Sequence, residues 1–182
     1  MNLDQLLASV REQTGYNLKR LEEKFSGMDE ETLNKKPSAN SWSPAECFNH
    51  LIVSNHLYLK HFPGITDKNR DKMRTSSEYK PTLTGKILVS MVNPENVKKG
   101  KAPGFMDPSK STVKAGVVER LQEDCKKILS IADVSEQLDL NKIKVPLSVT
   151  SLIKLSLADT LLMLAHHCTR HINQAERAAG IK

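Results

Sequence analysis

Four long stretches of this chain repeat apolar residues at intervals of three and four, which is the spacing of one face of an α-helix. The stretches begin near Leu3, after Ser43, near Ser111 and near Ser156. No strong strand pattern competes with them, since Pro146 limits the brief alternation around Val145 to an extended connection. A chain that must bury four apolar helix faces predicts an all-α fold, namely a four-helix bundle.

Start and stop signals define two of these helices. Ser43-Pro44-Ala45-Glu46 combines an N-cap serine, a proline at the first helical position and a glutamate at the third. Counted from this start, His50 lies on the inward side of the helix, among apolar neighbours. The last helix begins near Ser156, whose hydroxyl caps it while Asp159 complements the helix dipole, and it ends at Gly180.

A long crossover connection separates the second and third long helices. Residues 60–110 contain eleven basic and five acidic residues, whereas the rest of the chain has sixteen of each, so the whole net charge of +6 lies here. Leu83 to Val92 has the spacing of a short extra helix that Asn93-Pro94 stops. We interpret the remainder of 63–112 as a solvated loop that folds over one end of the bundle, in preference to a surface that draws in anionic ligands.

Length and composition limit the class of protein. A chain of 182 residues fits a single domain, residues 1–182, with a core large enough to need no disulfides. The three cysteines are odd in number and lack a C-x-x-C pattern, so a reducing cytoplasm is the expected location. The N-terminus has no targeting pattern and no segment has eighteen consecutive apolar residues, so we expect no membrane partner.

The same composition bears on the other partners. Aromatic residues make up 4% of the chain, and the basic connection lacks the interleaved aromatics that stack bases, so nucleic acid is not expected. A small-molecule substrate is the expected partner. Because two-fold dimers are the commonest oligomers, a homodimer stays open as the assembly.

Three histidines form the candidate functional site. His167 and His171 lie one helical turn apart on one face of the last helix, where Cβ atoms are about 6 Å apart. A facing helix must supply a third ligand, and the inward His50 fits that position. Imidazole suits Zn, Ni, Cu and Fe, and a site with three protein ligands leaves a position open for water or substrate. The sequence therefore predicts a divalent metal site at these three residues, with a chance H-x-x-x-H pair as the alternative.

Other polar residues near the histidines receive weaker roles. Gln174 looks into the same space, and Arg170 lies near enough to bind an acidic group of a substrate, although an outward salt bridge is an equally good explanation. His61 lies about 16 Å along the helix from His50 and cannot share an ion with it. His56 and His166 point elsewhere, as does Cys168. Cys125 lies within the inward stripe of the third helix and is typical of a plain core residue.

Two blocks of sequence resemble a known family. Residues 42–51, WSPAECFNHL, resemble the W-S-x-x-E-x-x-x-H-L signature of the DinB-like (YfiT-like) metalloenzyme superfamily, and residues 155–159 and 167–174 are similar to its closing segment. This resemblance implies a four-helix bundle with a divalent metal, often nickel or zinc, held by three histidines that map to His50, His167 and His171. It also implies thiol chemistry, because members include low-molecular-weight-thiol S-transferases and a thiol-dependent isomerase. Residues 63–112 match no motif of the family.

Two functional hypotheses follow. The first is a metal-dependent enzyme, most simply a thiol-dependent S-transferase or a hydrolase, in which the ion lowers the pKa of a thiol or water and Gln174, Arg170 or Lys98–Lys101 orients the substrate. The second is a bundle that binds a metal or small ligand without turnover, as a stress-response or dimerisation module. No convincing general base stands out in the sequence, which is compatible with a thiol nucleophile and also with the absence of catalysis.

Overall fold

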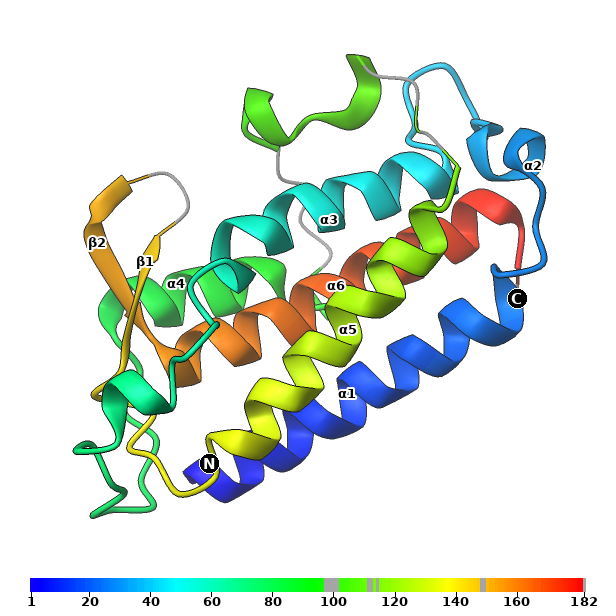
Figure 1. Cartoon of the computed structure of the whole chain (residues 1–182). Coiled ribbons are helices and arrows are strands. Elements are labelled where there is room, and N and C mark those ends of the chain that lie inside the picture. The colour runs from blue at the N-terminus through cyan, green and yellow to red at the C-terminus, as the bar shows by residue number, and fades with distance from the viewer. Residues whose placement is uncertain (97–101, 111–112, 114, 148–149, 182) are drawn as a thin grey trace.

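The fold is a four-helix bundle with additions at its side and at one end (Figure 1). The computed structural model describes residues 1–96, 102–110, 113, 115–147 and 150–181. The four long helices are α1 (Leu3–Lys24), α3 (Pro44–Leu59), α5 (Val117–Val134) and α6 (Leu157–Ala179). Helices α1 and α3 each pack against both α5 and α6, so the apolar faces of all four meet in one core. The predicted all-α bundle is therefore confirmed.

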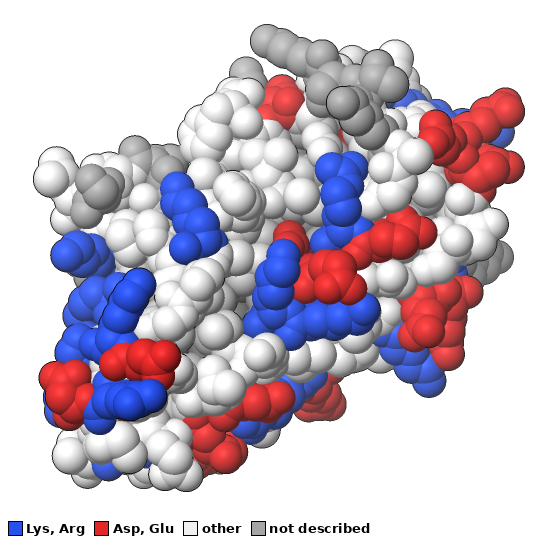
Figure 2. Space-filling model, viewed as in Figure 1, with Lys and Arg blue, Asp and Glu red and all other residues white. Residues whose placement is uncertain are grey.

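Smaller elements fill the connections. Helix α2 (Glu30–Asn34) lies between α1 and α3, and the crossover carries α4 (Leu83–Val92) with three short 3₁₀ turns: η1 (Asp67–Asn69), η2 (Gly104–Met106) and η3 (Pro108–Lys110). The predicted short helix in the crossover is thus confirmed as α4, which packs on the outside of α6. On the face in Figure 2, basic and acidic side chains are interspersed and do not form one continuous basic surface.

Two expectations about element boundaries were wrong. The third long helix was expected from near Ser111, which lies outside the described residues, and α5 begins at Val117, because Gly116 adopts a left-handed backbone (φ 73°) that a right-handed helix cannot contain. The segment around Pro146 is a paired strand and not only an extended connection. Strands β1 (Lys144–Leu147) and β2 (Thr150–Ser156) form an antiparallel hairpin in which Pro146 pairs with Lys154. A two-stranded sheet has only edge strands, so it tolerates a residue without a backbone N–H.

The predicted helix caps are confirmed in detail. Ser43 accepts a hydrogen bond from the Glu46 N–H (3.1 Å), and the Glu46 carboxylate accepts one from the Ser43 N–H (2.8 Å). The same reciprocal pattern joins Ser156 and Asp159 at the start of α6, and Gly180 ends α6 in the left-handed conformation. These caps fix the rotation of α3 and α6 and thereby direct their inward faces toward each other.

Asp159 has a second function that the sequence did not reveal. Its buried carboxylate accepts hydrogen bonds from the Tyr79 hydroxyl (2.6 Å) and from both the N–H and the hydroxyl of Thr82, which is the N-cap of α4. Gly85 on α4 lies directly against this carboxylate, in a position where a Cβ atom would overlap it. One buried acid therefore attaches the crossover and α4 to the start of α6.

Candidate metal centre

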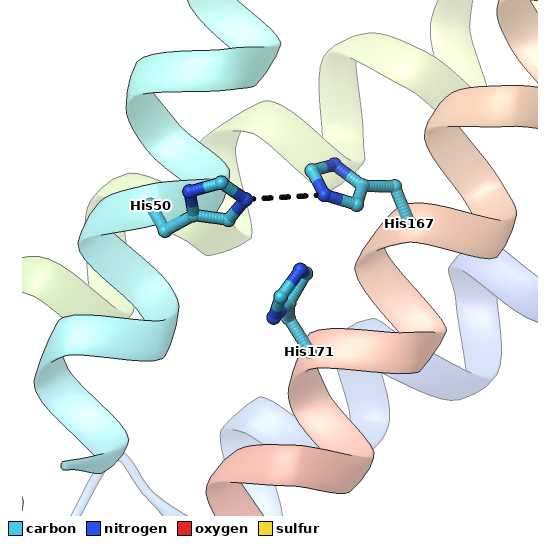
Figure 3. A group of neighbouring side chains, drawn as sticks. All are labelled: His50, His167 and His171. Carbon is cyan, nitrogen blue, oxygen red and sulfur yellow. Dashed lines mark hydrogen bonds between the residues drawn. The ribbon is translucent and has the colours of Figure 1, made fainter. Parts of the chain in front are cut away.

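The three predicted histidines meet in space (Figure 3). His50 projects from α3, and His167 and His171 project from α6, which packs closely against α3. The Nε2 atoms of His50 and His167 are 3.2 Å apart, and one nitrogen from each of the three rings lies within 4.8 Å of the others. The convergence of residues 117 positions apart in sequence, expected from helix registers, is thus present in the structure.

Hydrogen bonds on the far sides of two rings determine which nitrogen points inward. The Nδ1 atom of His50 lies 2.9 Å from the carbonyl oxygen of Met106, and the Nδ1 atom of His171 lies 3.0 Å from Oε1 of Gln174. Both partners are acceptors, so both Nδ1 atoms carry the hydrogen. The Nε2 atoms of His50 and His171 consequently keep their lone pairs, which is the tautomer that a metal ligand needs.

The third ring has the same tautomer for a different reason. Nδ1 of His167 lies 3.3 Å from the hydroxyl oxygen of Ser54, which could in principle donate or accept. The hydroxyl has one hydrogen, and it goes to the carbonyl oxygen of Leu51 at 3.0 Å. Ser54 must therefore accept from His167, and the lone pair of His167 also lies on Nε2. All three Nε2 lone pairs point toward one small space.

This donor set fits a divalent ion with tetrahedral preference. Zinc–nitrogen bonds of 2.0–2.1 Å place two ligands of a tetrahedron about 3.3 Å apart, which agrees with the 3.2 Å between Nε2 of His50 and Nε2 of His167. Two nitrogen lone pairs at that distance repel each other unless a positive charge lies between them. The geometry therefore matches the requirement of a three-histidine site with at least one further position for an exogenous ligand.

Burial keeps all three rings neutral. It lowers the pKa of His50, lowers that of His167 well below its usual value, and lowers that of His171 to about 3. The mutual proximity of the rings adds to the effect for His167 and His171, because a proton on one disfavours a proton on the next. Neutral imidazole is the form that binds a metal, so the site is ready to bind one at neutral pH.

A comparison with protein families agrees with this geometry. The model of the DinB superfamily matches residues 13–175, which includes all three histidines and most of the bundle. The chain belongs to the DinB superfamily. Comparison with curated proteins and with solved structures finds no match.

In this DinB-superfamily protein, Trp42 forms one wall of the histidine cluster. Its ring centroid lies 5.1 Å from that of His50 and 5.8 Å from that of His171, and it is stacked on the latter at 28°. Trp42 comes directly before the Ser43 cap, and the capping carboxylate of Glu46 also pairs with Lys36 at 2.8 Å. The helix start therefore holds the indole beside the candidate metal position.

The two predicted substrate-binding residues lie beside the cluster and already have protein partners. Gln174 accepts the hydrogen bond from His171, so it orients a candidate ligand. Arg170 donates hydrogen bonds to the carbonyl oxygens of Asn93 and Asn96, just beyond the end of α4. Its positive charge also contributes to the lowered pKa of His167 and His171. A role of either residue in substrate binding stays a prediction, and Lys98–Lys101 lies outside the described residues.

The residues that the sequence analysis excluded from the metal site lie outside the histidine cluster. His56 is exposed on α3, and the half-buried His166 turns toward α4, where its ring contacts the carbonyl of Val89. Cys168 is buried and accepts a hydrogen bond from the side chain of Asn55 (3.8 Å). Burial raises the pKa of the Cys47 thiol to about 12, so this thiol is not an activated nucleophile.

Two partners of the histidines were missed from the sequence. The Met106 contact uses a backbone carbonyl, which has no side-chain signal. Ser54 does have a sequence signal: it lies four residues after His50, on the same face of α3, where a hydroxyl among apolar residues needs a partner.

In the described part of the chain, no helix is long and apolar enough to cross a membrane.

Proposed function

We propose that the protein is a metal-dependent enzyme in which His50, His167 and His171 hold a divalent ion, zinc or nickel, and in which a low-molecular-weight thiol reacts with a small electrophilic substrate. A hydrolase-like reaction of water at the same site is the second form of this proposal. The observation that carries it is the convergence of three neutral imidazoles with their Nε2 lone pairs directed at one another. When bound, the ion supplies Lewis acidity, which lowers the pKa of a thiol or water that coordinates it.

The protein's own residues support the proposal of an anionic thiolate at the open position. The Nδ1 partners of the three rings are a carbonyl, a hydroxyl and an amide, all uncharged, so the ligands do not offset the charge of a dication. Of the charged groups that act on the rings, Arg170 adds a positive charge beside His167 and His171, and Asp107 adds a negative charge beside His50. A dication held by three neutral imidazoles keeps most of its charge and therefore favours an anion at the open position, and a thiol loses its proton far more easily than water does.

The residues around the cluster orient the three rings and shield them from water. Met106, Ser54 and Gln174 orient the rings through their Nδ1 atoms. Trp42 covers one side of the cluster with an apolar surface that excludes water. The three native cysteines are buried and unpaired, so the protein and a thiol cosubstrate both suit a reducing compartment, as the cytoplasm provides.

Metal stoichiometry tests the site. Protein purified without a histidine tag, stripped with a chelator and titrated with Zn²⁺ or Ni²⁺ is expected to bind one ion per chain, and His171→Ala is expected to lose stoichiometric binding. His56→Ala is the matched control, because it removes an exposed imidazole from α3 and leaves the cluster intact. Trp42 is the only tryptophan, so quenching of its fluorescence by Ni²⁺ reports binding at this position. Undiminished binding by His171→Ala would remove the site assignment.

Turnover separates catalysis from simple binding. The metal-loaded protein is expected to accelerate conjugation of common cellular thiols to a generic electrophile, with the activity lost in His171→Ala. The competing candidate is a bundle that binds a metal or small ligand without catalysis. One observation favours it: in the described part of the chain, the Nδ1 atoms of the three rings bond to a carbonyl, a hydroxyl and an amide, none of which acts as a general base. Stoichiometric metal binding with no turnover for any common thiol or for hydrolysis would support that candidate instead.

A further inference from the structure

The three rings of the cluster differ in where the partners of their Nδ1 atoms come from. Gln174 is on α6 and Ser54 is on α3, so both of these partners belong to the long helices that carry the histidines. The partner of His50 is the carbonyl oxygen of Met106, which lies 56 residues further along the chain, in the 3₁₀ turn η2 of the crossover. Two of the rings are therefore oriented by the bundle itself, whereas the orientation of His50 depends on how the crossover docks.

We refer to residues 102–110, which carry η2 and η3, as the strap. Both turns lie against α3, above it in Figure 1. Within η2, Met106 is 9% exposed although it is outside the main apolar core, and the neighbouring Phe105 is 58% exposed. A 3₁₀ turn of three residues contributes little stability of its own. The strap is therefore held mainly by its docking on α3, and the hydrogen bond from His50 to Met106 is part of that docking.

In the absence of an ion, the docked arrangement contains one unfavourable contact. With hydrogens on the Nδ1 atoms, the Nε2 lone pairs of His50 and His167 face each other at 3.2 Å. If the hydrogen of His50 were on Nε2 instead, this nitrogen would donate to Nε2 of His167, and the contact would become a hydrogen bond with no change in net charge. The docked strap prevents this change, because a bare Nδ1 lone pair would then face the Met106 carbonyl oxygen at 2.9 Å.

We propose that the strap and the divalent ion stabilise each other, which makes the strap a two-state switch for the metal site; this inference rests on the proposed function. With the strap docked, the Met106 carbonyl keeps the hydrogen of His50 on Nδ1, and Nε2 is available to the ion. With the strap undocked, the hydrogen is on Nε2, where it bonds to His167 and occupies both lone pairs. Because the ion binds only the first state, it favours docking, and by linkage docking raises the affinity for the ion.

Metal affinity tests this coupling. Met106→Ala removes the buried side chain of the strap but keeps the backbone carbonyl, and is expected to weaken Ni²⁺ binding about 10- to 100-fold in a titration followed by Trp42 fluorescence. Met106→Leu restores an apolar side chain of similar size and is expected to bind nearly as tightly as wild type. Phe105→Ala is the matched control, because it truncates the exposed neighbour in the same turn, and is expected to bind like wild type.

The titration also separates this proposal from the proposed function. Wild type that binds no ion would refute the proposed function and the switch together. Wild type that binds one ion, with the same affinity in Met106→Ala, would refute the switch alone.

Nuclear magnetic resonance tests the position of the hydrogen without any metal. Proton–nitrogen correlation spectra of imidazole rings distinguish the form with hydrogen on Nδ1 from the form with hydrogen on Nε2. In Met106→Ala, His50 is expected to shift toward the Nε2 form, whereas His171 is expected to keep its hydrogen on Nδ1, because its partner Gln174 is on α6. A merely structural loss of packing would not move this signal. The same form of His50 in wild type and in Met106→Ala would overturn the proposal.

Hydrogen exchange tests the coupling in the reverse direction. The Met106 amide donates to the carbonyl oxygen of Pro103 (2.8 Å) within the strap, and saturating Zn²⁺ is expected to slow its exchange, because the ion favours the docked state. The Asn69 amide makes a similar bond to Thr66 (3.1 Å) in η1, which supplies no Nδ1 partner to the three rings, and its exchange is expected to stay the same. Equal exchange of the Met106 amide with and without Zn²⁺ would contradict the switch.

Discussion

Acidification should destabilise the metal-free protein through its histidine cluster. In the unfolded chain His171 takes up a proton near its ordinary pKa of 6.5, whereas burial and the neighbouring His50 lower the pKa to about 3 in the folded protein. Between these two values the unfolded state binds more protons than the folded state. The free energy of unfolding must therefore fall as the pH falls below about 6.5.

The magnitude follows from this shift. One such group changes the free energy of unfolding by about 1.4 kcal/mol per pH unit, so His171 contributes a loss of about 2 kcal/mol between pH 6.5 and pH 5. The pKa values of His50 and His167 are also lowered in the folded protein, so these two residues also reduce the free energy of unfolding as the pH falls. Since a domain of this size is stabilised by roughly 5–15 kcal/mol, the cluster alone removes a substantial part of the total at pH 5.

Denaturant unfolding at a series of pH values, with a chelator present, measures this effect. The informative quantity is the difference in the free energy of unfolding between wild type and His171→Gln at each pH, because the contributions from other titrating groups cancel in it. Wild type is expected to lose about 2 kcal/mol more than His171→Gln over this interval. His56→Gln, which removes an exposed imidazole, is expected to follow the wild-type curve. Parallel curves for wild type and His171→Gln would refute the inference that the folded site excludes protons.

Further substitutions test the packing of α4 and the orientation of His171. Gly85→Ala would force a methyl group into the carboxylate of Asp159 and is expected to lower the free energy of unfolding by about 1–3 kcal/mol in denaturant titrations, whereas Gly15→Ala, with open space around it, should raise it by about 0.5–1 kcal/mol. A Gly85→Ala variant as stable as wild type would contradict the close packing of α4. Gln174→Leu removes the acceptor for Nδ1 of a candidate ligand and should weaken Ni²⁺ binding about 10- to 100-fold in a titration followed by Trp42 fluorescence. An unchanged dissociation constant would show that the amide does not orient the ring.

The helices and the histidine cluster were predictable because both depend on local signals. The caps at Ser43 and Ser156 fix where α3 and α6 begin, and a fixed start determines which side of a helix each later residue occupies. Together with the four-residue spacing of His167 and His171, this was enough to predict that residues far apart in sequence would meet. The exposure of His56 follows from the same counting.

The remaining features depend on contacts between distant segments, which have no local signal. The carboxylate of Asp159 looks like a simple capping residue in the sequence, and its bonds to Tyr79 and Thr82 exist only because the crossover returns to the start of α6. Met106 contributes through its backbone carbonyl. The late start of α5 depends on the backbone angle of Gly116, although the apolar spacing begins earlier, with the buried Val113.

The order of the three histidines along the chain has a consequence for how an ion would be acquired. A ribosome makes α3 long before it makes α6, so His50 is synthesised 117 residues before His167, the first of its two partners. A nascent chain that lacks α6 therefore cannot assemble the three-histidine cluster, so under the proposed function metal binding would follow docking of α6. An ion bound there would join α3 and α6 directly, in addition to the main chain and the packing between them. Its removal by a chelator would therefore weaken the attachment of α3 to α6 as well as abolish the chemistry.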